Sequence, residues 1–459
     1  MSTYTSDTPD DRAAMLAAIG AQSIDDLFAD IPANVRLQRE LDLPAGKPEF
    51  EVFDHLASLA EKNIHADREI SFLGAGMYDH YVPALVDSII SRSEFLTPYT
   101  PYQPEVSQGN LQVMFEYQTA IAELTGLDVS NASVYEGPSA MAAAGYLAFN
   151  ENKRGKFVVS GAVNPQYRQT LKTNAHGYGG EVIEVPAENG LTDPATFADA
   201  IDEDTSAIFI QNPNFFGSVE DLGALTEAAH AKGALVVCVA DPLTLGVLAP
   251  PGDFGVDICV GEGQTLGNRL DFGGPSFGFF AATTKLIRRM PGRIAGETVD
   301  ADGRRGWVLT LQTREQHIRR EKATSNICTS QALNALAGTI YLSWLGRKGI
   351  VELGELMLKR TAYAREQLAA VEGVELLFDA PVFREFAIKV DAPARAVLDQ
   401  LALDGINGGY RLGIDYPEHE DGILVAITEK RSREQIDLFA KSLASAVQAA
   451  KVNAPGVSA

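Results

Sequence analysis

The chain between residues 134 and 281 alternates short apolar runs with amphipathic stretches. Continuously apolar, β-branched runs predict strands, and they lie at 157–161, 181–185, 207–211, 234–240, 257–261 and 276–281. Helices are predicted between them at 165–175, at 194–202 and after Ser218, which we expect to cap the third helix. Because such strands bury both faces, this order predicts a mainly parallel sheet covered by helices.

Amphipathic helices are also predicted before this region. The first 70 residues predict a helical arm, in which Ser23 caps the segment IDDLF. A later helix of the arm places Phe53, Leu56 and Leu59 on one face. Residues 111–126 predict another amphipathic helix, with Gly126 as its C-cap.

After residue 325 the pattern changes to a mixture of helices and strands. A long helix is predicted over about 329–345, strands at VELLF, FAIKV and ILVAIT, and a closing helix from EKRS to QAA. We therefore expect an α/β protein in three parts. These are a helical arm over 1–70, a large domain with a mainly parallel sheet over 71–325 and a small α+β domain over 326–459.

Composition narrows the class of protein without revealing its activity. The 459 residues are 46% hydrophobic and 22% charged, as in ordinary globular proteins. A net charge of −23 opposes binding to nucleic acids and anionic membranes. The three cysteines form no C-x-x-C motif, and the N-terminus has no basic and apolar secretory pattern. We therefore expect a cytoplasmic protein from a reducing compartment.

Several common catalytic motifs are missing from the chain. There is no GxxxxGK[ST] phosphate loop and no G-x-S-x-G nucleophile motif. The seven histidines show neither H-x-H nor H-x-x-x-H spacing, so a metal site is not expected. The segment GEGQTLG at 261–267 departs from the dinucleotide-binding pattern because its third glycine falls one residue late.

Tyrosines are concentrated in one irregular stretch. Tyr78, Tyr81, Tyr99 and Tyr102 are four of the 14 tyrosines, and TPYTPYQPE alternates proline with tyrosine. Each proline fixes its own φ and extends the residue before it, so this segment displays phenols and the Glu105 carboxylate on stiff backbone. Such a segment suits a binding pocket, and the alternative is a packed loop between domains.

Three other features suit ligand binding, each with a plain structural alternative. At 135–144 a Gly-Pro turn and Ser139 open a helix whose N–H groups could hold an anion such as phosphate, or which is simply capped and packed. Asp241 ends a strand where parallel sheets place ligands, or makes a turn before Pro242. Six glycines within 260–281 permit close approach of a ligand, or form an irregular connection.

Longer segments resemble a known family. SIDDLFADIP, FLGAGMYDHYVPALVDSIISRSEFLTPYTPYQPEVSQG, QTAIAELTGLDVSNASVYEGPSA, FGGPSFGFFA and GGYRLGIDYPE resemble subunit 1 (alpha) of the two-subunit P-protein, the glycine decarboxylase of the glycine cleavage system. The resemblance spans about residues 11–445. It implies a fold-type I pyridoxal-phosphate architecture, with a large seven-stranded α/β domain and a small C-terminal domain.

The resemblance also implies a reaction and partners. In that family, glycine forms an imine with pyridoxal 5'-phosphate and loses its carboxylate as CO2, with the pyridinium ring as electron sink. The aminomethyl group then passes to the lipoyl disulfide of the H-protein. An α2β2 assembly with subunit 2 is implied.

The lysine that such an enzyme needs is missing from its expected place. In this fold it follows the strand after the ring-pairing aspartate, which Asp241 matches, and so it should fall near 262–266. No lysine occurs between Lys232 and Lys285, and Gln264 occupies the expected place. Since an amide cannot form an imine, we expect subunit 2 rather than this chain to bind the cofactor covalently. Ser139, Asp241 and Gln264 are then interpreted as relics of a cofactor pocket.

We expect this chain to complete the partner's site in trans. Tyr99, Tyr102, Gln103 and Glu105 are the candidate catalytic residues, on a loop that would line the channel for glycine and the lipoyl arm. Two alternatives stay open. The chain could be a purely structural subunit, or an independent pyridoxal enzyme that uses Lys285.

Overall fold

The computed structural model describes residues 5–328 and 330–452. The chain separates into two compact units, Met1–Ile64 and His65–Ala459, which we call the arm and the body. The predicted boundaries at residues 70 and 325 stay a prediction, because both large sheets belong to the body.

The arm consists of short helices with well-formed N-terminal caps. Its elements are α1 (Pro9–Ala18), a 3-10 helix (Ile24–Phe28) and α2 (Glu49–Ala60). Ser23 caps the 3-10 helix, as predicted, and exchanges hydrogen bonds with Asp26. None of these three elements contains a buried residue. The predicted apolar face of α2 therefore forms, but its large side chains are exposed.

The body is built on a seven-stranded sheet with the order β2-β8-β7-β6-β5-β3-β4. Its strands are β2 (Val129–Ser130), β3 (Lys156–Ser160), β4 (Glu181–Val185), β5 (Thr205–Asn212), β6 (Leu235–Ala240), β7 (Ile258–Glu262) and β8 (Gly278–Ala282). The five strands from β7 to β4 are parallel, and β8 and β2 are antiparallel to their neighbours. The predicted mainly parallel sheet is confirmed.

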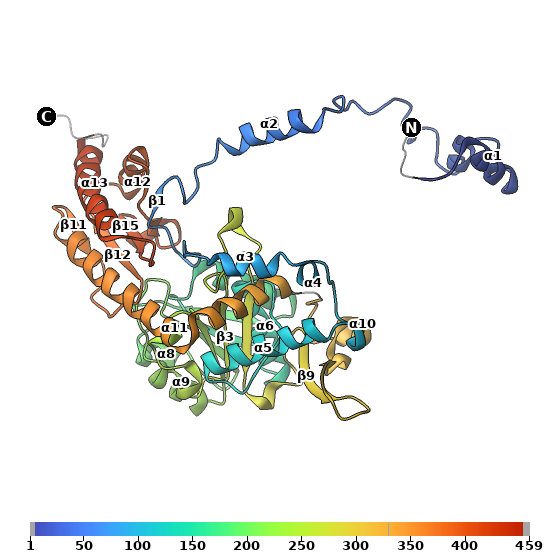
Figure 1. Ribbon diagram of the computed structural model, residues 1–459. Coiled ribbons are helices and arrows are strands. Elements are labelled where there is room, and N and C mark those ends of the chain that lie inside the picture. Colours follow the sequence, from blue (N-terminus) through green and yellow to red (C-terminus); the bar gives the residue numbers. More distant parts are fainter. Residues whose placement is uncertain (1–4, 329, 453–459) are drawn as a thin grey trace. The chain divides into compact units, whose positions relative to one another are not determined.

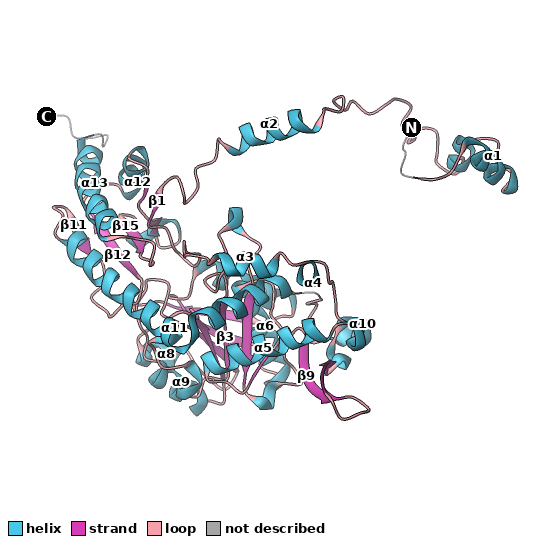
Figure 2. Ribbon diagram, viewed as in Figure 1, coloured by secondary structure: helices cyan, strands magenta, loops and turns pink. Residues whose placement is uncertain are grey.

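Helices cover both faces of this sheet (Figure 2). They are α5 (Gln108–Thr125), α6 (Gly137–Asn152), α7 (Pro165–Gly177), α8 (Pro194–Asp199) and α9 (Leu222–Ala231). Side chains alternate along β5: Ala207 and Phe209 enter the core under α6 and α7, whereas Ile208 and Ile210 enter the core under α8 and α9. This alternation explains why the strands are apolar throughout.

Two sequence predictions for these helices were wrong in detail. Ser218 does not cap α9: it is fully buried and forms a β-bridge with Val382. Asp221 is the N-cap, because its carboxylate accepts a hydrogen bond from the Ala224 amide at 3.1 Å. The helix predicted at 194–202 ends at Asp199.

A smaller antiparallel sheet, β11-β12-β15-β14, forms the C-terminal part of the body. Its elements are β11 (Val374–Leu376), β12 (Glu385–Val390), β14 (Tyr410–Arg411), β15 (Gly422–Ala426), α12 (Ala394–Leu403) and α13 (Arg433–Val452). The long helix α11 (Ala332–Ala369) packs beside α5 (Figure 1) and leads into this sheet. It is interrupted at Gly346, where φ is +60°.

Short elements connect these layers. They are β1 (Ile70–Ser71), which pairs with β13 (Ile406–Asn407), the helices α3 (Ala84–Ile90), α4 (Ser93–Leu96) and α10 (Gln316–Arg319), and the hairpin β9 (Ile294–Val299) and β10 (Arg305–Thr310). Across the described residues, no helix combines the length and apolarity needed to cross a membrane.

Candidate active site

Two predicted residues lie at the carboxyl edge of the large sheet. Asp241 follows β6 and Gln264 follows β7, and these strands are parallel neighbours. The carboxyl edge is where parallel α/β sheets bind ligands. Here, however, the Asp241 carboxylate forms an ion pair with the guanidinium of Arg384, whose side chain is only 3% exposed. The predicted ring-pairing acid is thus already paired with a cation of its own chain.

The side-chain amide of Gln264 forms hydrogen bonds to backbone groups through both its oxygen and its nitrogen. Its oxygen accepts a hydrogen bond from the Tyr78 N–H at 3.0 Å. Its nitrogen donates to the carbonyls of Tyr78 at 3.0 Å and Asn268 at 2.8 Å. The residue is 1% exposed. Gln264 therefore ties the segment around Tyr78 to the edge of the sheet.

Tyr78 fills the space between the two sheets. Its ring lies 3.5 Å from the guanidinium carbon of Arg384, and its hydroxyl donates to Glu385 at 2.5 Å. Glu385 also accepts a hydrogen bond from the Ala75 amide at 2.7 Å. Burial raises the pKa of Glu385 to about 7, despite these hydrogen bonds and the nearby Arg384. Burial, followed by the charge of Glu385, raises the pKa of Tyr78.

A second carboxylate occupies the start of α6. Glu262, the last residue of β7, accepts hydrogen bonds from the backbone amides of Gly137 at 3.0 Å and Gln264 at 3.1 Å, and from the Ser276 hydroxyl. Burial raises the pKa of this carboxyl, although the three hydrogen bonds oppose the shift. The anion expected at this helix N-terminus is therefore a side chain of the same protein.

Ser139 acts as a capping residue in the first turn of α6. Its hydroxyl donates to the carbonyl of Glu136 at 2.9 Å and accepts from the amide of Glu136 at 3.2 Å. The glycine-rich stretch serves internal packing at Gly278, where a Cβ atom would lie 2.5 Å from the Glu136 backbone. Both features make packing and capping contacts within the chain, and their predicted role in ligand binding stays a prediction.

The tyrosine loop, residues 97–106, lies on the surface. Tyr99 is 78% exposed, and Gln103 and Glu105 are exposed too. The Tyr102 hydroxyl accepts a hydrogen bond from Arg293 at 2.9 Å, and its ring meets the His317 ring edge-on at 5.6 Å. Among the described residues, no hydrogen bond or ion pair joins this loop to Asp241 or Gln264. The predicted catalytic residues are therefore not bonded to the predicted cofactor-binding residues Asp241 and Gln264.

Comparison with known proteins assigns the family. The family model described as "Glycine cleavage system P-protein" matches residues 2–443. The chain belongs to the glycine cleavage system P-protein family. It is similar to the "Probable glycine dehydrogenase (decarboxylating) subunit 1" of Moorella thermoacetica, with 50% identity over 96% of this chain and 99% of the relative. The relative of the same name from Desulforamulus reducens is 51% identical over 95% of this chain and 98% of its own length.

Solved structures agree with this family. A crystal structure of glycine decarboxylase (P-protein) of the glycine cleavage system, in inhibitor-bound form, matches with a TM-score of 0.89 and 44% identity, over 97% of this chain and all of that one. The glutamate decarboxylase of Lactobacillus brevis matches with a TM-score of 0.70, over 93% of this chain and 98% of that one, at only 14% identity, which shows the fold alone. The expected fold-type I architecture is confirmed.

Pyridoxal phosphate does not fit the carboxyl edge of this P-protein family member. The cavity beside Asp241, Arg384 and Tyr78 holds only about 30 Å³, whereas small-molecule pockets measure roughly 300–1,000 Å³. Arg384 faces the aspartate and Glu262 faces the helix N-terminus, so the chain supplies both charges that a bound cofactor would bring.

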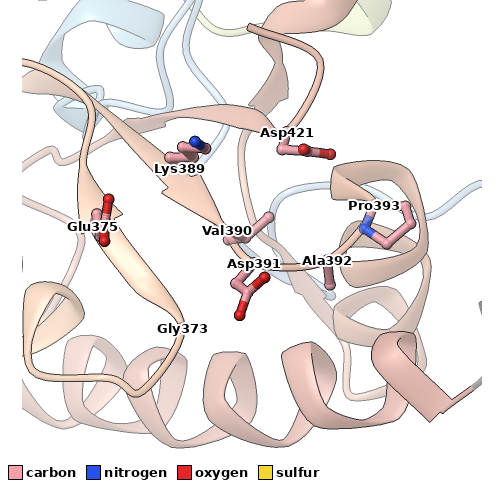
Figure 3. A pocket seen from close by; sticks show the side chains of 8 residues that line it. All are labelled: Gly373, Glu375, Lys389, Val390, Asp391, Ala392, Pro393 and Asp421. Carbon is pink, nitrogen blue, oxygen red and sulfur yellow. The ribbon is translucent and has the colours of Figure 1, made fainter.

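Three larger pockets in the described part of the chain are lined by none of the four predicted catalytic residues. One of about 520 Å³ lies at the rim of the small sheet, lined by Glu375, Lys389, Asp391 and Asp421 among others (Figure 3). Another of about 410 Å³ includes Ser139 and faces α6, α7 and residues 316–327. Within the described part of the chain, no group of three histidine, cysteine or acidic side chains is placed to hold a metal.

Lys285 lies at the opposite edge of the sheet from Asp241. Its amine pairs at 2.7 Å with Asp257, which precedes β7, whereas Gln264 follows β7. The side chain is 62% exposed. This position argues against an independent pyridoxal enzyme that uses Lys285.

Sequence reasoning missed Arg384, Glu385 and Glu262. Arg384 lies just before β12 and Glu385 is its first residue. Arg384 is 143 positions beyond Asp241, and no local pattern connects such distant residues. A usable signal was present, since adjacent opposite charges at the start of an apolar strand (PVFREFAIKV) need partners if that strand is buried.

Proposed function

We propose that this chain is the alpha subunit of glycine decarboxylase and works only together with subunit 2. Subunit 2 would hold pyridoxal 5'-phosphate on its lysine, in an α2β2 assembly that decarboxylates glycine and serves the lipoyl arm of the H-protein. The observation that carries this proposal is the carboxyl edge: Gln264 bonds to backbone where the fold needs an amine, and Arg384 pairs with Asp241.

The exposed arm supports a partner subunit. Sixteen of the 34 large hydrophobic side chains exposed among the described residues lie within residues 15–64. Helices of 10 and 12 residues are marginal in water without a covered apolar face. Within the described part of the arm nothing covers these faces, so they need another surface to pack against. The relatives' name, subunit 1, leads us to assign that surface to subunit 2.

Within this proposal, the tyrosine loop is the part offered to the partner's site. Because Arg293 donates to the Tyr102 oxygen, the hydroxyl hydrogen of Tyr102 is free to point outward and donate to an anionic group such as the glycine carboxylate. Arg293 is 4% exposed and lies 3.4 Å from Glu315, which fixes its position. Tyr99 would line the channel, and Gln103 and Glu105 would bind polar groups or relay a proton.

The test is Tyr99→Phe and Tyr102→Phe in a complex reconstituted with subunit 2, assayed by glycine-dependent CO2 exchange. We expect at least one variant to lose about tenfold or more in rate, as for a lost charge-assisted hydrogen bond worth about 1.5–3 kcal/mol. The matched control is Tyr363→Phe. Tyr363 lies on α11, and its hydroxyl donates a hydrogen bond to Asp437 on α13 at 2.5 Å. Native rates for both loop variants in a normally assembled complex would establish the purely structural subunit.

A further inference from the structure

We propose that this chain's own side chains have replaced pyridoxal phosphate at the carboxyl edge of its sheet, with Gln264 in place of the lysine, Arg384 in place of the pyridinium nitrogen and Glu262 in place of the phosphate. The inference rests on the proposed function for the identity of the cofactor. It deepens that function, because the residues interpreted above as relics become working parts of an internal ion-pair site.

The first replacement concerns the charge facing Asp241. An acid in this position stabilises a cation, and here the cation is a guanidinium carried by the residue just before β12. Arg384 also contacts His80, and its planar group lies against the Tyr78 ring. A charge that is 3% exposed must be paired within the protein. The counter-ion of Asp241 is therefore Arg384, a residue of the same chain.

The second replacement concerns the start of α6. A helix N-terminus presents free N–H groups that favour an anion. The carboxylate of Glu262 accepts hydrogen bonds from the backbone N–H groups of Gly137 at 3.0 Å and Gln264 at 3.1 Å. Gly137 itself leaves no spare room, since a Cβ atom there would overlap the Tyr167 hydroxyl. An incoming phosphate would therefore meet the negative charge of Glu262 at this N–H group.

The third replacement gives the site its role. Gln264 holds Tyr78 from the large sheet, while Glu385 and Glu429 hold the same segment from the small sheet side. The Tyr81 amide donates to Glu429 at 2.6 Å. The segment 74–81 is therefore fixed between the two sheets. It continues through α3 and α4 into the tyrosine loop.

Restoring the lysine tests the replacement directly. We expect Gln264→Lys protein, incubated with pyridoxal phosphate and reduced with borohydride, to carry no more adduct at position 264 than Gln448→Lys carries at its exposed helix position. The readouts are visible absorbance and peptide mass. Stoichiometric adduct at position 264 would overturn the inference, because the pocket would then be open.

A second variant keeps the inference falsifiable if Gln264→Lys does not fold. Asp241→Asn leaves Arg384 buried without its anion, so we expect a loss in urea-unfolding midpoint several times that of Asp302→Asn, whose carboxylate is 69% exposed beside Arg304. Equal midpoints for the two variants would overturn the inference. Neither readout uses subunit 2 or glycine, so failure of the proposed in-trans role would leave both results unchanged.

Discussion

The carboxyl-edge pocket and the tyrosine loop contain the same kinds of residues in opposite states. In the pocket, Tyr78 and Glu385 are nearly inaccessible and bonded to each other. On the loop, Tyr99 is 78% exposed and, among the described residues, has no hydrogen bond to its hydroxyl. A buried polar group must be satisfied internally, whereas an exposed one is free for another molecule. The difference separates residues that hold this subunit together from residues that it offers to others.

The largest effect is expected where the pocket loses its cation. Arg384→Met should lower the free energy of unfolding by about 3–5 kcal/mol, because it leaves Asp241 largely buried and uncompensated. Equilibrium urea unfolding measures this loss. Arg304→Met is the control, since that guanidinium is 77% exposed and its removal should cost less than about 0.5 kcal/mol. Equal losses would mean that the pocket contributes no more than a surface ion pair.

The pocket should also affect how the stability of the protein depends on pH. Glu385 has a pKa of about 7 in the folded protein, against an ordinary value of 4.5. The folded state therefore holds a proton that the unfolded state releases, and stability should fall as pH rises from 4.5 to 7, by up to about 3 kcal/mol. Glu385→Gln removes this titration, so its stability should change less across that window than the wild type's. Parallel pH profiles would contradict the assignment.

A smaller effect is expected at the inner edge of the loop. Tyr102→Phe loses one hydrogen bond from Arg293 and should cost about 1 kcal/mol in unfolding free energy. The ring itself remains near Arg293 and His317, so no cavity forms. Unfolding curves of the variant and wild type at one pH provide the comparison. A loss as large as that of Arg384→Met would place Tyr102 with the structural group.

The smallest effect is expected at the tip of the loop. Tyr99→Phe should change the unfolding free energy by less than about 0.5 kcal/mol, because its side chain contributes little to the packed fold. The same variant is tested for CO2 exchange in the complex. A large effect on exchange with almost none on stability is the signature of a residue offered to the partner; the reverse pattern would remove Tyr99 from the candidate site.

The sequence was sufficient to predict the sheet. Continuous apolar runs predict buried parallel strands, and β4 lies at the predicted residues 181–185. Which side chains pair with each other could not be predicted from the sequence in the same way. Arg384 meets Asp241 only after the small sheet has folded against the large one. Ser218 is buried in a β-bridge with Val382, a residue 164 positions away, and Asp221 caps α9 in its place. Periodicity reports burial along one element, whereas ion pairs depend on which elements meet.

The exposed helices of the arm have a consequence for how the protein is made. Between residues 15 and 64 the chain carries apolar faces without a core and exposes Arg39, Lys47 and Lys62, which trypsin-like proteases cleave. If subunit 2 covers these faces, as proposed, a newly synthesised chain is open to proteolysis and aggregation until subunit 2 binds. Balanced production of the two subunits then becomes a condition for survival of this one, and co-expression should extend its lifetime more than any change within the body.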